Sequence, residues 1–186
     1  DENTFVGGYA AGLGAVTGDS NVCVGYAAGY DLTSGASNVL VGRDAGANVT
    51  TGTGNTFLGK GAGDQATTGS ENIAIGIDAM GLGVTANASE TYGMYNVAIG
   101  SGAGYDLTTG ESNILLGHGA GKNFTDNHNN IVMGFNAMDG ATGGEHRNIA
   151  IGCNALGVEN SNAAYCVAIG DQALKLQDAD VKNTAI

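Results

Sequence analysis

An eight-residue phrase recurs along the chain and constrains its fold more than any single residue does. The phrase is Asn, three mostly apolar residues, Gly, two variable residues and Ala, as in NTFLGKGA from Asn55. Ten complete copies occur, the last beginning with Cys166, and an eleventh starts as NTAI at Asn183. The motif glycines are 17 or 18 residues apart, except for one step of 24 residues from Gly76 to Gly100. A unit this short cannot bury an apolar face alone, so the copies must stack on one another.

We therefore predict an all-β fold in which residues 1–186 form one parallel β-roll or β-solenoid of about ten 17-residue coils. The Asn of each phrase is expected to stack coil upon coil through its amide, and the Gly to occupy a bend where a Cβ would clash or φ is positive. The coil-forming pairs are Asn21 and Gly25, Asn38 and Gly42, Asn55 and Gly59, Asn72 and Gly76, Asn96 and Gly100, Asn113 and Gly117, Asn130 and Gly134, and Asn148 and Gly152. Cys166 interrupts the Asn series and predicts a local weakness or an end effect there.

Composition excludes several classes of protein. The chain has 34 glycines and no proline, without the third-residue glycine period of collagen. Hydrophobic residues make up 42% and charged residues 13%, which argues against disorder. The net charge of −12 opposes binding to nucleic acid or to an anionic membrane surface. No apolar run reaches the roughly 20 residues of a membrane span, and we expect the chain to be a segment of a longer fibre.

The three apolar positions of each phrase predict an association surface. Side chains alternate along a strand, so we expect the first and third positions to fill the coil and the middle one to point outward. The middle position is never charged, and a strand that is apolar on both faces is covered on both. We therefore predict association of identical chains along their length. The predicted interface residues are Phe5, Cys23, Leu40, Phe57, Leu115 and Val132.

The remainder of each coil reads as a short second strand and a turn. In phrases such as AGYDLT from Ala28, the apolar residues Leu32, Val49, Ala66, Leu107 and Phe124 lie seven positions after a motif glycine and are expected to face inward. Four other coils place Met80, Met138, Leu156 or Leu174 after the alanine, where these residues should fill the interior instead. TSG and TTG sequences supply the turns.

The phrases NVAIGSGA, NIAIGIDA and NIAIGCNA resemble the head repeat of trimeric autotransporter adhesins. The longer unit NTFLGKGAGDQATTG looks like the variant found in fibres of phages and environmental bacteria. The resemblance implies a left-handed parallel β-roll, an intertwined or side-by-side homotrimer and an extracellular location on a cell surface or virion tail fibre. The period of 17 residues is longer than that of the usual adhesin head, and no coiled-coil stalk or membrane anchor accompanies it.

Residue types that carry catalysis or bind metals do not recur in a usable pattern. His118, His128 and His146 occupy variable or turn positions, and we interpret them as surface residues. A threefold axis that gathers one His per chain around a metal is the alternative. The acidic residues lack the nine-residue phase of calcium-binding rolls. We expect no enzyme activity, no cofactor and no metal; Cys23 is interpreted as a buried small hydrophobe, and a Cys153–Cys166 disulfide is a weaker alternative.

The single long step holds an insertion at about residues 83–95, GVTANASETYGMY. Loops that project from a regular scaffold are where binding residues concentrate, so Glu90, Tyr92 and Tyr95 form a candidate recognition loop; a tolerated decoration is the competing interpretation.

These observations predict a structural and adhesive rod segment of a trimeric extracellular fibre, either a bacterial surface adhesin head or a phage tail fibre. Its partners would be two further copies of itself and an unidentified cell-surface or matrix receptor. One alternative is a subunit of an extracellular filament or sheath that assembles end to end. A second is an ice-binding solenoid, suggested by Thr33, Thr50, Thr67, Thr108 and Thr125 at equivalent coil positions, although turn chemistry already accounts for them.

Overall fold

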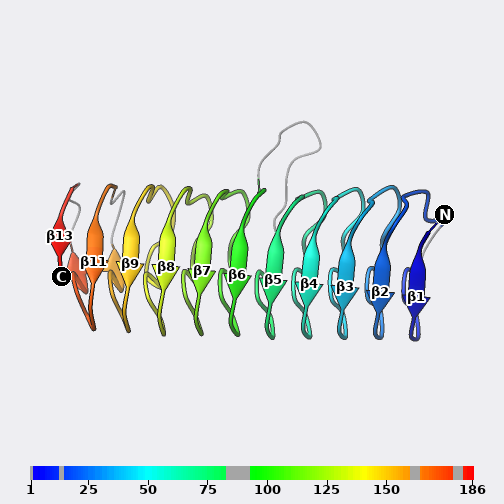
Figure 1. Cartoon of the computed structure of the whole chain (residues 1–186), viewed down its shortest axis with the longest axis horizontal. Helices are drawn as coiled ribbons and strands as arrows, with labels where there is room; N and C mark the ends of the chain where they lie inside the picture. The colour runs from blue at the N-terminus through cyan, green and yellow to red at the C-terminus, as the bar shows by residue number, and fades with distance from the viewer. Residues whose placement is uncertain (1, 13–14, 83–92, 160–163, 178–181) are drawn as a thin grey trace.

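The computed structural model of the chain is a stack of coils built on one parallel sheet (Figure 1). It describes residues 2–12, 15–82, 93–159, 164–177 and 182–186, and these contain no helix. Eleven strands pair in the order β1-β2-β3-β4-β5-β6-β7-β8-β9-β11-β13. The predicted all-β class and the parallel stacking of the coils are therefore confirmed. The strands are β1 Thr4–Val6, β2 Val22–Val24, β3 Val39–Val41, β4 Thr56–Leu58, β5 Ile73–Ile75, β6 Val97–Ile99, β7 Ile114–Leu116, β8 Ile131–Met133, β9 Ile149–Ile151, β11 Val167–Ile169 and β13 Thr184–Ala185.

Every phrase pairs in register with the next, because each strand holds the same three positions. Leu40 lies opposite Phe57, and Phe57 lies opposite Ala74. The 24-residue step does not disturb this register, since Ala74 pairs with Ala98 in the same way. The two ends of the chain lie at opposite ends of the resulting rod (Figure 1).

The core is formed by the middle residue of each strand, so the predicted orientation of the strands is wrong. Cys23, Leu40, Phe57, Leu115 and Val132 are all fully buried within a single chain, and the residues on either side of them are exposed or half-buried. A coil only three strand residues wide has room for one inward side chain, and strand alternation then turns both neighbours outward. Phe5, in the first coil, is 39% exposed. The buried middle residues therefore offer no surface to another chain.

The return path of each coil is a turn and not the second strand that the sequence predicted. Residues 26–31 and their equivalents form consecutive turns after the motif glycine. Only β10 (Val158–Glu159) and β12 (Leu176–Gln177) form a second sheet among the described residues. The prediction for the inward apolar residues is confirmed: Leu32, Val49, Ala66, Leu107 and Phe124 are buried.

The interior of each coil is filled by one side chain from the strand together with side chains from the turn. Where the strand supplies Leu40 or Phe57, the turn position that faces it is Gly46 or Gly63. Where the strand supplies Ala74 or Ala150, the equivalent turn position is the buried Met80 or Leu156. The predicted role of these Met and Leu residues as interior fillers is thus confirmed, and Met138, in the coil whose strand supplies Val132, is fully buried as well. Close packing of an interior requires such exchange between large and small residues.

The motif glycines occupy a backbone conformation and a space that other residues cannot. Gly59 has φ of +140°, and a Cβ built on it would overlap the carbonyl group of Gly76 in the next coil. Gly42 and Gly117 show the same overlap with the following coil. Successive coils therefore approach so closely at this bend that only glycine is accommodated.

Candidate functional site

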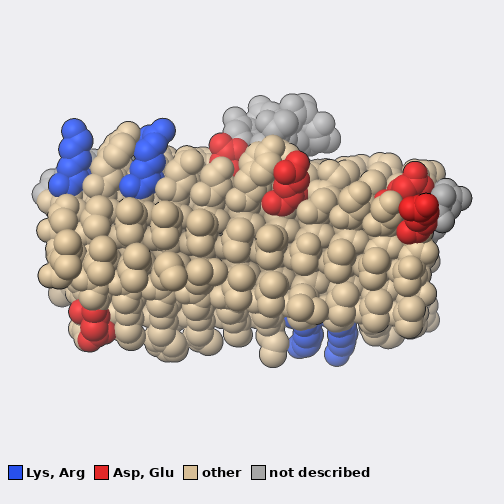
Figure 2. Space-filling model, in the orientation of Figure 1, with Lys and Arg blue, Asp and Glu red and all other residues tan. Residues whose placement is uncertain are grey.

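The side of the sheet that faces away from the core is a continuous apolar surface, here called the outer sheet face. It consists of the first and third residues of β1–β9 and β11, and each of these residues is Val, Ile, Leu, Met or Thr. The most exposed of them have between 37% and 55% of their surface accessible: Val6, Val39, Leu58, Ile73, Ile99, Ile114, Ile131 and Met133. Charged side chains lie along the two long edges of this face, and the band between the edges holds none (Figure 2). A charge-free apolar band of this length is the kind of surface that marks an interface.

The asparagines of the phrases form a buried ladder, as predicted. Asn38 donates from its backbone N–H and from Nδ2 to Oδ1 of Asn21, at 3.0 Å each, and its Nδ2 also donates to the carbonyl oxygen of Gly52 at 2.9 Å. The same bonds recur in the following coils. At Cys166 the ladder is only partly lost, because the backbone N–H of Cys166 still donates to Oδ1 of Asn148 at 2.9 Å. The ladder ties each coil to the next and leaves no buried amide group of Asn38 without a partner.

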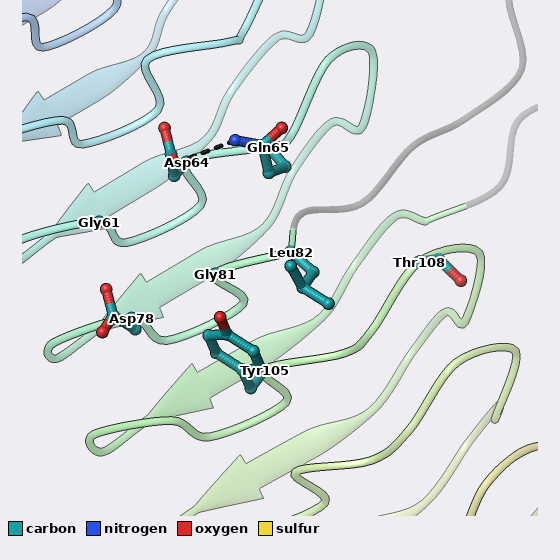
Figure 3. A pocket seen from close by; sticks show the side chains of 8 residues that line it. All are labelled: Gly61, Asp64, Gln65, Asp78, Gly81, Leu82, Tyr105 and Thr108. Carbon is teal, nitrogen blue, oxygen red and sulfur yellow. Dashed lines mark hydrogen bonds between the residues drawn. The ribbon is translucent and has the colours of Figure 1, made fainter.

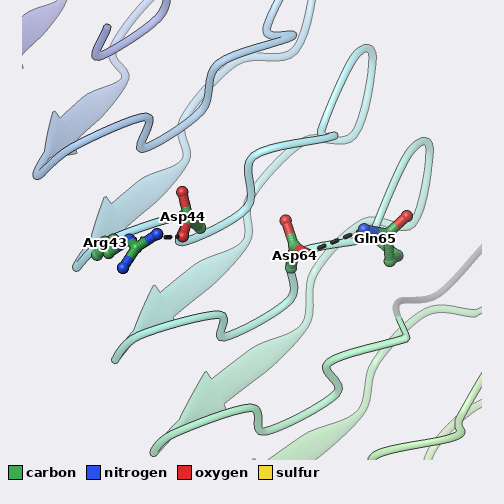
Figure 4. Close-up of polar contacts among 4 residues, drawn as sticks. All are labelled: Arg43, Asp44, Asp64 and Gln65. Atoms are coloured by element: carbon green, nitrogen blue, oxygen red, sulfur yellow. Dashed lines mark hydrogen bonds and ion pairs between the residues drawn. The ribbon is translucent and has the colours of Figure 1, made fainter. Parts of the chain in front are cut away.

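A polar pocket of about 460 Å³ lies on the turn side of coils four to six, beside the long step (Figure 3). Its lining residues are Gly61, Asp64, Gln65, Asp78, Gly81, Leu82, Tyr105 and Thr108. Gln65 Nε2 donates to Asp64 Oδ2 at 3.0 Å (Figure 4). Burial raises the pKa of Asp64, and the carboxylates of Asp44 and Asp78 raise it further, against the lowering effect of the Gln65 hydrogen bond. The pocket can accept hydrogen bonds from a hydroxylated ligand.

The predicted recognition loop is only partly placed by the structure. Glu90 and Tyr92 lie outside the described residues. Tyr95 is 53% exposed, has φ of +61° and directly precedes Asn96 of the ladder, so it belongs to the regular coil. Tyr95 does not line the pocket next to Leu82.

Two of the three histidines are part of a regular stack and not merely surface residues. The rings of His128 and His146 stack with their centroids 5.0 Å apart. Nδ1 of His128 accepts from the backbone N–H of Glu111 at 3.1 Å, and Nδ1 of His146 accepts from that of His128 at 3.2 Å. Burial lowers the pKa of His128, and the neighbouring His146 lowers it further. His118, by contrast, is an exposed residue whose ring stacks on Phe135 at 5.1 Å.

Sequence reasoning missed a buried carboxyl group beside this stack. Glu145 is fully buried, and its Oε2 accepts from the backbone N–H of Gly143 at 2.9 Å and from the side chain of Asn127. Its Oε1 has no hydrogen-bond partner among the described residues, and burial raises the pKa of the carboxyl group. The repeat marks this position as unusual, because Asn127 and Glu145 occupy the turn position at which Gly52 and Gly110 stand in other coils.

The structure places no disulfide bond among Cys23, Cys153 and Cys166. Burial raises the pKa of the Cys23 thiol to about 11, as expected for a thiol in an apolar interior. Cys153 is exposed and Cys166 is buried, and the alternative of a disulfide between them is not realised.

Threonine hydroxyls of the turns bond from coil to coil. Oγ1 of Thr33 donates to the carbonyl oxygen of Thr50, and that of Thr50 to Thr67, at 3.0 Å each. The turn role expected for these residues is what the structure shows.

Across the described part of the chain, no three His, Cys, Asp or Glu side chains gather in an arrangement that would hold a metal ion. Within the same ranges, no helical segment has the length and hydropathy needed to cross a membrane. Comparison of the chain with protein-family models, with characterised proteins and with solved structures gives no match.

Proposed function

We propose that this chain is a structural and adhesive rod segment of a homotrimeric extracellular fibre, which mediates attachment to a host cell or surface. The carrier would be a bacterial surface adhesin head or a phage tail fibre. The observation that carries the proposal is the outer sheet face, an apolar band that runs along the sheet and that a single chain leaves open to water.

The outer sheet face supports self-association better than recognition of a separate partner. Both columns repeat the same small set of residues from coil to coil, so the surface offers the uniform, flat contact that an identical copy can match along its length. The first column carries Ile73, Ile114 and Ile131, and the third carries Leu58, Ile99 and Met133, all of which would lose accessible apolar surface on association. The number three for the copies rests on the resemblance of the repeat to trimeric adhesin heads.

The coil geometry supports a role as a rigid spacer. Each coil is joined to the next by strand pairing, by the asparagine ladder and by turn hydrogen bonds such as that from the backbone N–H of Gly46 to the carbonyl oxygen of Ala62 at 2.9 Å. Bonding of this kind along the whole rod leaves no flexible joint between consecutive described coils.

The test is the mass of the purified chain in solution, measured by light scattering at micromolar concentration. The proposal expects three copies for the wild type and a single copy for the double variant Ile114→Lys/Ile131→Lys, whose two lysines would enter the outer sheet face. Because both side chains are already exposed in one chain, the variant should keep its fold, which circular dichroism would verify. Thr51→Lys, at an exposed turn residue, is the matched control and should remain trimeric. A monomeric or dimeric wild type would overturn the trimer.

A further inference from the structure

Three tyrosines from the first two coils come together on the turn side of the rod. Tyr9 lies two residues after Gly7, and Tyr26 and Tyr30 lie one and five residues after Gly25. The Tyr9 ring meets the Tyr26 ring edge to face, with centroids 5.5 Å apart and an interplanar angle of 81°. It meets the Tyr30 ring in the same manner, at 6.3 Å and 74°. Together with Ala27 these rings line a pocket of about 390 Å³.

These rings are presented to solvent and do not belong to the core. Tyr9 is 63% exposed and Tyr26 is 52% exposed. Tyr30 is half-buried. No hydrogen bond joins any of the three hydroxyl groups to another group in the described part of the chain, so each retains its capacity to donate and accept. The small side chain of Ala27 leaves room between them, since it stands at the turn position that Tyr9 fills one coil earlier. Edge-to-face packing leaves ring faces free for a ligand.

The positive charge of Arg43, which lies beside the Tyr26 ring, is neutralised by the negative charge of Asp44. The Arg43 guanidinium lies 6.0 Å from the centroid of the Tyr26 ring, and Arg43 Nε is paired with Asp44 Oδ2 at 3.0 Å (Figure 4). Because a cation already occupies this position over Tyr26, the pocket is not an empty cage for a ligand ammonium group. The net charge of −12 disfavours a polyanionic ligand.

We propose that the pocket formed by Tyr9, Tyr26, Ala27 and Tyr30 binds a neutral saccharide. The C–H faces of a pyranose ring are apolar and flat enough to stack on tyrosine rings, and its hydroxyl groups can bond to the tyrosine hydroxyls. A volume of about 390 Å³ falls in the range of pockets that hold small ligands. The inference rests on the proposed function, because it names the class of ligand to which the fibre would attach. The pocket itself is formed by residues of a single chain.

The experiment presents the full chain to immobilised oligosaccharides ending in glucose, galactose, mannose or N-acetylhexosamine, with sialylated and sulfated glycans as comparators. We expect saturable binding to at least one neutral saccharide. Tyr26→Ala and Tyr30→Ala should each weaken it about tenfold, as loss of one stacking ring implies. The chain has seven tyrosines and no tryptophan, so a saturable change in tyrosine fluorescence provides a second readout in solution.

Tyr165→Ala serves as the matched control. Tyr165 is 51% exposed and has Arg147 over its ring at 5.5 Å, and no tyrosine ring of the described residues packs against it. Tyr165→Ala should bind as the wild type does. Absence of binding to every neutral saccharide, binding to acidic glycans alone, or equal loss in Tyr30→Ala and Tyr165→Ala would each overturn the proposal. The mass measured on the same samples separates the two proposals: a trimer that binds no neutral saccharide overturns only the ligand, and a monomer that binds one overturns only the assembly.

Discussion

At the scale of single residues, the asparagine of each coil forms several buried hydrogen bonds to the neighbouring coils. Asn113 donates from its backbone N–H and from Nδ2 to Oδ1 of Asn96, at 3.1 and 3.0 Å. Its Nδ2 also donates to the carbonyl oxygen of Asn127 at 2.7 Å, and its Oδ1 accepts two bonds from Asn130 at 3.1 Å each. Because the residue is fully buried, removal of its amide leaves several polar groups without water or a partner.

Asn113→Ala should therefore lower the free energy of unfolding by about 3 kcal/mol or more, since each buried group left unpaired costs about 1–3 kcal/mol. Chemical denaturation followed by circular dichroism measures this loss. The neighbouring Ser112 is exposed with φ of +58°, so Ser112→Gly keeps the backbone conformation and should change stability little. Equal stability of Asn113→Ala and Ser112→Gly would show that the ladder contributes nothing.

Glycine in the turns serves two separable purposes, conformation and space. Gly63 and Gly102 have φ of +59° and +64°, but a Cβ on Gly63 would overlap the Phe57 ring whereas one on Gly102 would meet nothing within 4 Å. Gly102→Ala should cost about 1–2 kcal/mol for the left-handed backbone alone. Gly63→Ala should cost about 2–5 kcal/mol, because overpacking of the buried ring adds about 1–3 kcal/mol. Thermal and urea denaturation of the pair test this, and equal losses would refute the role of Phe57.

At the scale of elements, sequence periodicity predicted every strand of the main sheet but not which way its side chains point. The first, second and third positions of the phrase are mostly apolar, so hydrophobicity gives too little contrast to tell the two faces apart. A second signal was present. In most coils the middle position varies in size together with the turn: Leu40 and Phe57 accompany Gly46 and Gly63, and Ala74 accompanies Met80. The coil with Ala98 and Gly104 is an exception. Residues that exchange volume must share one interior, and this pattern assigns the middle position to the core.

The candidate sites were less predictable than the strands because they depend on the turns. The repeat places Tyr9 and Tyr26 in neighbouring coils, two and one residues after their motif glycines. The angle between their rings follows from the turn path, which the sequence wrongly suggested to be a strand. The fully buried Glu145 departs from the turn glycine of other coils, so its position was visible in the repeat although its hydrogen bonds were not.

The stacked turns that hold His128 and His146 should make these coils sensitive to acid. Nδ1 of His128 must be unprotonated to accept from Glu111, and its pKa in the folded chain is lowered from an ordinary value of 6.5 by burial and by His146, against the opposing effects of Glu111 and Asp126. The unfolded chain therefore binds this proton first. Stability should fall as pH drops below about 6.5 toward the lower pKa of the folded state.

Urea denaturation at pH 7.5 and pH 5.5 measures the effect, which should be smaller in His128→Gln than in the wild type. The comparison of the two proteins also cancels the separate contribution of Glu145, whose raised pKa has the opposite sign: it favours the folded state at low pH and loses that effect as pH rises above 4.5. His118→Gln, at an exposed ring, should behave as the wild type does. An unchanged pH dependence in His128→Gln would contradict this account.

At the scale of the whole molecule, charge and apolar surface act against each other in assembly. Each copy carries a formal charge of −12, and the charged side chains around the outer sheet face lie along its edges (Figure 2). Copies that associate through the apolar band must therefore bring like net charges together. At 0.1 M salt the Debye length is about 10 Å, so repulsion between charges farther apart than this is largely screened. The free energy gained by burial of apolar surface does not depend on this screening.

Association should consequently strengthen as sodium chloride is raised from about 20 to 300 mM, which sedimentation velocity over a range of protein concentrations measures. The opposite dependence is expected of an interface held by ion pairs, because salt weakens those. The double variant Ile114→Lys/Ile131→Lys supplies the matched comparison: its lysines reduce the net negative charge, so a purely electrostatic barrier would let it associate better than the wild type. If association instead depends on burial of the outer sheet face, this variant should stay dissociated at every salt concentration, and the two outcomes distinguish apolar contact from charge as the determinant of assembly.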